Sequence, residues 1–378
     1  MTSFVVTAIG MTTSLGLDSA DACAAARAGL VRLTDVDTLN ATIEPAMAKE
    51  DLDGIPPFAG HMAPVVGSGC AGLAKLLALS RPALTELVGK MRRTPEGVGR
   101  TGLCVNVSDA FVESRFAEEP EGFDEEVPPT YAERWARTVA AFPDRLRALC
   151  DLDVPREALV VFAGGHVGIM AMLRHGAQLI RSGAVDRCIV GAVDSCFDPI
   201  ALRAYATAGI LKSAANPVGF FPGEAGAYFL LEPETAMSAR AAIRISATAL
   251  SSDHPSLSTE AVPCGRGISD AVAEVVGRDT DAKAFPALFI ADLNGTEGRA
   301  LDWGHALVRL RSMFGEPTFD VWLPAQSFGE TGAAAGALAV CMAHRAVERG
   351  YFPASAAVVT LASEDGRRGA MLLEDVRR

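Results

Sequence analysis

One histidine stands where the sequence could support chemistry. In the stretch VFAGGHVGIMAML, an apolar run ends at two glycines, and His166 comes directly before a helical pattern. A helix N-terminus carries a partial positive charge, which disfavours the cationic form of an imidazole. We therefore expect a neutral His166, which could act as a general base or acid beside a carboxylate. The other interpretation of this histidine is structural: it fills a volume and makes hydrogen bonds.

The elements around His166 place it at the edge of a sheet. ALVVFAGG predicts a buried strand, HVGIMAMLRHGAQLIRSG predicts a helix that ends at Gly183, and DRCIVGAVD predicts a second strand. A crossover of this length indicates a βαβ unit of neighbouring parallel strands. The glycine turn then lies at the carboxyl edge of the sheet, where α/β proteins bind their ligands.

Composition excludes several classes of function. The chain has 378 residues, 49% of them hydrophobic, and a net charge of −12, which argues against a nucleic-acid partner. Its first residues do not resemble a signal peptide, and no apolar run reaches the ~18 residues needed to cross a membrane, so we expect a cytoplasmic protein without a membrane partner. The eight cysteines lack zinc-ligand spacing, which predicts reduced thiols and no metal site.

The order of elements predicts a duplication. Strand, glycine turn and Ala-rich helix recur after Pro233, so we expect an α/β protein of two similar lobes, residues 1–233 and residues 234–378. Residues 110–135 are acidic and contain prolines, and they predict a surface excursion without a role in chemistry.

Four motifs together resemble the β-ketoacyl synthases of the thiolase superfamily. FVVTAIGMTTSLG is similar to the opening VVVTGxGxxSPxG of that family, GAQLIRSGAVDRCIVGAVDS to ARxIxxGxADxxxxGG, GFFPGEAGAYFLLE to FxxGEGAGxxxLE, and SFGETGAAAGALA to TGHxxGAAGxxx. The resemblance covers nearly the whole chain in order. It implies a thiolase-like five-layer α-β-α-β-α fold of two duplicated lobes, generally a homodimer, that acts on acyl thioesters of acyl carrier protein or coenzyme A.

The same resemblance identifies candidate site residues, and each departs from the family. His166 falls where the family has its nucleophilic cysteine, and Asn294 and Glu330 fall where it has two catalytic histidines. At the family's substrate gate, SEDGRRG is only a loose match and places Glu364 or Asp365 there. Gly165, at the elbow turn, joins them as a candidate substrate-binding position. A metal site built from His166, Glu330 and Asp365 is disfavoured because these ligands have no recognised spacing, and we expect no cofactor.

Two functions remain open at this stage. The first is a ketosynthase-like protein of fatty acid or polyketide biosynthesis that has lost condensation. It would bind an acyl thioester, a carrier protein or a partner subunit, as a homodimer or as a heterodimer with a ketoacyl synthase-like subunit. The second is an acyltransferase or thioester hydrolase with a rebuilt site of His166, Glu330 and Asn294. The loss of the nucleophile while the glycine scaffold persists favours the first.

Overall fold

The structure is a computed structural model. It describes residues 4–35, 55, 57–63, 66–67, 69–92, 99–116, 130–149, 153–234, 243–255, 262–278, 280 and 283–377. The strands are β1 (Phe4–Thr12), β2 (Thr34–Asp35), β3 (Ala59–Gly60), β4 (Thr101–Val107), β5 (Leu159–Ala163), β6 (Arg187–Ser195), β7 (Glu224–Pro233), β8 (Ile243–Ser252), β9 (Leu288–Ala291), β10 (Asp320–Trp322), β11 (Ala356–Ala362) and β12 (Arg367–Asp375). The α-helices are α1 (Ser19–Arg27), α3 (Gly72–Arg92), α4 (Phe111–Phe116), α5 (Tyr131–Leu149), α6 (Gly168–Arg181), α7 (Pro199–Thr207), α8 (Arg266–Val276), α9 (Glu297–Phe314), α10 (Ala325–Phe328) and α11 (Ala335–Arg349).

Two half-sheets of the same strand order make up the large sheet. The order is β10-β9-β11-β12-β8-β1-β7-β6-β4-β5. From the middle outward, one half is β1-β7-β6-β4-β5 and the other is β8-β12-β11-β9-β10. If the strands of each half are numbered by their order in the sequence, both halves have the order 1-5-4-2-3. The halves meet where β1 pairs antiparallel with β8, from Phe4 opposite Ile245 to Val6 opposite Ile243. The chain therefore repeats one topology twice, as the sequence predicted; the division into residues 1–233 and 234–378 stays a prediction.

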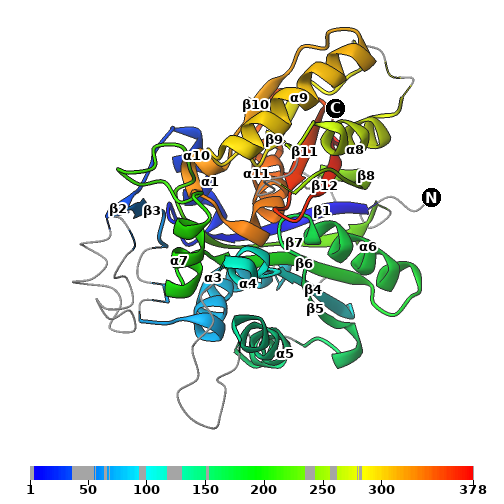
Figure 1. The fold of residues 1–378 in the computed structure, drawn as a ribbon. Coiled ribbons are helices and arrows are strands. Elements are labelled where there is room, and N and C mark those ends of the chain that lie inside the picture. Colours follow the sequence, from blue (N-terminus) through cyan, green and yellow to red (C-terminus); the bar gives the residue numbers. More distant parts are fainter. Residues whose placement is uncertain are drawn as a thin grey trace.

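The described residues form four hydrophobic cores, and three of them pack against the faces of the two half-sheets. Along β7, Phe229 and Leu231 face the central core, whereas Tyr228 and Leu230 face a core shared with α3 and α5. A third core joins the outer face of the second half-sheet to α8 and α9. Helices α6 and α11 lie in the central core, between the half-sheets (Figure 1). The five layers are therefore α3 and α5, a half-sheet, α6 and α11, a half-sheet, and α8 and α9, which confirms the predicted fold class.

Two expectations about the elements beside His166 are wrong. Strands β5 and β6 are not neighbours, because β4 lies between them and pairs parallel with both. The β5 run is not a buried strand either: it forms the outer edge of the sheet, and Phe162 is exposed. A crossover helix fixes the direction of the strands it connects, but not how many strands it passes over.

The predicted surface excursion over residues 110–135 needs correction at both ends. Residues 111–116 form α4, where Val112 and Glu113 are buried. Residues 131–135 begin α5, where Trp135 packs against the core. Residues 117–129 lie outside the described part of the chain.

Candidate functional site

The elbow that carries His166 is fixed by its backbone. β5 ends at Ala163, and α6 begins at Gly168. Gly165 has a φ of +59°, and a Cβ there would lie 2.5 Å from Oδ2 of Asp109, so the turn needs a glycine. The side-chain amide of Asn106 donates to the carbonyl of Gly165 at 2.7 Å. This turn holds His166 at the carboxyl edge of the sheet, as predicted.

The three predicted catalytic positions come together. Nε2 of His166 lies 2.9 Å from Oε1 of Glu330, and the side-chain amide of Asn294 donates to Oε2 of the same carboxylate. Oε1 also accepts from the backbone N–H of Gly332 at 2.7 Å. His166 precedes α6 in the first half of the chain and Glu330 follows α10 in the second, so their contact joins the two halves.

Arg299 completes this cluster, and sequence reasoning missed it. Its guanidinium is 2% exposed and donates to Glu364 at 2.9 Å and to the carbonyl of Asp292 at 2.9 Å. It also lies 3.5 Å from Oε2 of Glu330 and 3.0 Å from Nε2 of His166. A signal was available: Arg299 lies in the first turn of α9, where the helix dipole disfavours a cation. An arginine there is best explained by carboxylates that hold it.

The charges around His166 work against the expected neutral imidazole. Burial and Arg299 lower the pKa of His166, but the charge and hydrogen bond of Glu330 outweigh them, so the pKa lies above 6.5. Burial raises the pKa of Glu330, whereas His166 and Arg299 lower it by more, and it lies well below its usual range. The expectation of a neutral imidazole rested on the helix end, whereas the carboxylate of Glu330 acts on the pKa of His166 in the opposite direction.

Two further acids stand beside the cluster. Burial raises the pKa of Asp194 to about 6, although Asp194 accepts from the backbone N–H groups of Ala333 and Ser195. Burial likewise raises the pKa of Glu113 to about 7, and the Tyr205 hydroxyl donates to this carboxyl at 2.5 Å. Sequence reasoning assigned no role to Glu113, because its segment was expected to lie on the surface.

A cavity of about 50 Å³ connects these groups. His166, Gly165, Arg299, Glu330 and Glu364 line it, together with Asp194 and Glu113. Pockets that enclose a small-molecule ligand usually measure roughly 300–1,000 Å³. The space beside His166 is therefore suited to a few waters rather than to an acyl chain.

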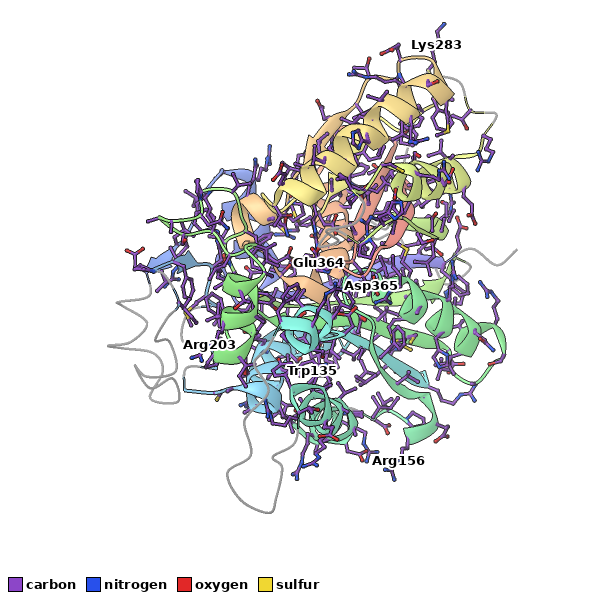
Figure 2. The ribbon with its side chains drawn as sticks, viewed as in Figure 1. Trp135, Arg156, Arg203, Lys283, Glu364 and Asp365 are labelled. Carbon is purple, nitrogen blue, oxygen red and sulfur yellow. The ribbon has the colours of Figure 1, made fainter. Side chains whose placement is uncertain are left out.

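The predicted gate residues have different neighbours. Figure 2 places Glu364 and Asp365 near the middle of the molecule, between the two halves. Glu364 lines the cavity and forms an ion pair with Arg299. Asp365 binds Arg367 at 2.5 Å, and Arg367 also binds Asp109. Asp365 is not one of the residues that line the cavity, so its role at a gate stays a prediction.

Neither a membrane helix nor a metal cluster occurs in the part of the chain that the structure describes. No helix there is both long enough and apolar enough to cross a bilayer. Among the same residues, no group of three or more His, Cys, Asp or Glu side chains is arranged to hold a metal ion.

The architecture is that of the thiolase-like ketosynthases. A type II polyketide ketosynthase solved with its acyl carrier protein and bound to the hexaketide is similar to 99% of this chain over 99% of its own, with a TM-score of 0.69 and 13% identity. The ishigamide ketosynthase/chain length factor matches with a TM-score of 0.65 and 18% identity, over 99% of both chains. The ketosynthase ApeO in complex with its chain length factor ApeC, from Xenorhabdus doucetiae, matches over 99% of this chain and 98% of its own, with a TM-score of 0.66 and 15% identity. No protein-family model and no curated protein sequence matches the chain.

Proposed function

We propose that this chain is a ketosynthase-like subunit that does not condense thioesters and that acts by binding a ketosynthase-type partner subunit or an acyl carrier protein. One observation carries the proposal. At the elbow where the resemblance implies a nucleophilic cysteine, the imidazole of His166 is tied through Nε2 to Glu330 and Arg299.

This contact removes what a nucleophile needs. A raised pKa favours the imidazolium, which has no free lone pair to attack a carbonyl. In the neutral tautomer with its proton on Nδ1, Nε2 accepts a hydrogen bond from Arg299 instead. The cavity beside it is also much smaller than a pocket for an acyl thioester. All three conditions work against covalent transfer, while the fold around them is intact.

The similar structures support a binding role. Two of them are described with a chain length factor, and another is a ketosynthase with its acyl carrier protein. A chain of the same architecture without the nucleophile fits the position of a partner in such an assembly. Fatty acid or polyketide biosynthesis is the pathway class that follows from this proposal.

The proposal predicts that a cysteine-bearing ketosynthase is encoded beside this chain, and co-expression of the two tests it. We expect native mass spectrometry to find a one-to-one heterodimer, or a complex with the acyl carrier protein of the same gene cluster. If the chain forms only complexes with itself in the presence of both, the proposed function is wrong.

A rebuilt active site is the second candidate function. It is favoured by the contact of His166 with Glu330, and by Nδ1 of His166, which has no hydrogen-bond partner among the described residues. Acyl release from a panel of acyl and malonyl thioesters, on coenzyme A and carrier protein, tests it by mass spectrometry. Turnover that is lost in His166→Ala and Glu330→Gln but retained in His175→Ala would establish a hydrolase or acyltransferase. We expect no turnover with any donor.

A further inference from the structure

A second, larger cavity lies away from His166. It measures about 570 Å³, within the range of roughly 300–1,000 Å³ that small-molecule pockets occupy. Residues of α1, β10, α10 and α11 line it, together with the segment that follows α11. None of its lining residues also lines the cavity beside His166. Neither the resemblance nor the proposed function assigns it a role.

One side of this cavity is aromatic and polarisable, and the rest of its lining includes the polar side chains of Gln326 and Ser327. The rings of Trp322 and Tyr351 lie 6.5 Å apart, tilted by 38°, and Phe352 packs edge-on against Trp322. The Met342 thioether adds a side chain that adapts to the shape of a ligand. Trp322, Tyr351 and Met342 are all half-buried, so each has surface left to contact a ligand. Such walls favour a flat aromatic ring over a flexible aliphatic chain.

Arg27 lines the cavity, and its guanidinium can donate hydrogen bonds to a ligand. The guanidinium of Arg27, in the last turn of α1, lies 4.2 Å from the centroid of the Tyr351 ring. It makes no hydrogen bond or ion pair with any residue that the structure describes. Stacking on the ring orients its planar fork, which matches a carboxylate or a sulfonate. Asp320 also lines the cavity, so an anionic ligand must place its charge at Arg27 and away from Asp320.

We propose that this cavity binds a small planar aromatic molecule that carries one anionic group. The ring packs against Trp322 and Tyr351, and the anionic group pairs with Arg27. Binding is non-covalent, since Cys23, the thiol in the wall, is buried and its pKa is raised to about 12.

Two fluorescent probes of matched shape test the proposal. 1-Anilinonaphthalene-8-sulfonate is an aromatic anion, and N-phenyl-1-naphthylamine is the same ring system without the sulfonate. We expect the anionic probe to saturate one site on the folded protein, with energy transfer from Trp322 that is lost in Trp322→Phe. Arg27→Gln should weaken the binding of the anionic probe by about tenfold or more, as expected for the loss of a charged hydrogen bond. It should change the affinity of the neutral probe less than twofold. Arg349→Gln, an exposed arginine outside the cavity, is the matched control and should change neither.

Filling the cavity gives an independent readout. Met342→Trp should abolish binding of both probes. Because Met342 is half-buried and the larger side chain could disturb folding, Ala26→Phe fills the same cavity from the surface of α1. Equal affinity of the anionic probe in wild type and Arg27→Gln would overturn the proposal. So would binding that survives in a folded cavity-filling variant, or the lack of any saturable site.

Discussion

Nε2 of His166 lies within hydrogen-bond distance of both Glu330 and Arg299. When Nε2 carries a proton it can donate to Glu330, and when it does not it can accept from Arg299, but it cannot do both. Since Glu330 raises the pKa of His166 against the opposing effects of burial and Arg299, the protonated arrangement is favoured. In that arrangement Nε2 donates to Glu330 across the two halves of the chain and offers no lone pair of its own for base catalysis.

The pKa shift of His166 should change sign in Glu330→Gln, from raised to lowered. In the wild type we expect a pKa above 6.5; in the variant the pKa should fall below 6.5, because burial and Arg299 remain and the carboxylate is gone. NMR of ¹³C-labelled histidine measures both values, with His166→Ala to assign the signal. A pKa that is the same in both proteins would contradict the ion pair.

The same substitution should cost most stability at the pH values where both His166 and Glu330 are charged. The raised pKa of His166 contributes stability that is fully present below about pH 6.5 and lost as the pH rises through the pKa of the folded state. The lowered pKa of Glu330 contributes stability that is present above about pH 4.5 and lost as the pH falls. We expect Glu330→Gln to lower the free energy of unfolding by about 3 kcal/mol near pH 6, and by less at pH 9. Urea titrations at both values check this.

Glu113 should make the protein less stable as the pH rises. Burial raises its pKa from 4.5 to about 7, so its contribution is present below about pH 4.5 and lost as the pH rises through 7. Glu113→Gln keeps the shape of the side chain and an oxygen that can accept from Tyr205. The free energy of unfolding of wild type relative to this variant should fall by up to about 3 kcal/mol between pH 5 and pH 8. A constant difference across that range would show that Glu113 does not titrate in it.

At the scale of the elements, the turn into α6 and the turn out of it use glycine for different reasons. Both Gly165 and Gly183 have positive φ, but a Cβ on Gly183 would meet nothing within 4 Å, whereas one on Gly165 would meet the carboxylate of Asp109. The first glycine therefore shapes the elbow that presents His166, and the second only ends the helix.

Alanine at these two glycines should separate conformational strain from crowding. Gly183→Ala should cost about 1 kcal/mol of unfolding free energy, from the positive φ alone. Gly165→Ala should cost about 1–3 kcal/mol more, because the new methyl group has to displace Asp109. Thermal and urea unfolding measure both costs. Equal costs would mean that the elbow relaxes without strain.

Sequence patterns predicted where strands and helices lie along the chain more reliably than which strands are neighbours in the sheet. The strands and helices on both sides of His166 lie where their apolar periodicity placed them, and the repeated order of elements predicted the two half-sheets. The position of β4 between β5 and β6 could not be predicted, because strand order depends on long-range pairing. The same limit applies to the site: motifs predicted His166, Asn294 and Glu330, but Arg299 belongs to no motif and becomes visible only through the carboxylates it contacts.

The whole molecule is joined by its central core. That core takes residues from β6 and α6 in one half and from β11 and α11 in the other, such as Val190, Ile169, Val359 and Leu338. Each of these helices therefore packs on both half-sheets. Separating the halves would expose the largest of the hydrophobic cores in the described residues to water.

The two halves should consequently unfold together. Trp135 reports on α5 in the first half, and Trp303 reports on α9 in the second. We expect variants that keep one of these tryptophans, with the other two replaced by Phe, to show the same midpoint of urea unfolding. Two separate midpoints would mean that the predicted lobes are independent folding units.

The contact between His166 and Glu330 has a consequence for how this chain arose. His166 precedes α6, Glu330 precedes α11, and these helices occupy equivalent places in the repeated topology. In a symmetric pair of identical ancestral units, such positions would carry the same residue and face each other with like charge or none. A base at one position and an acid at the other need two different sequences, which the two halves of one chain provide. The buried pair of His166 and Glu330 therefore depends on an asymmetry that no homodimer of half-length chains could have.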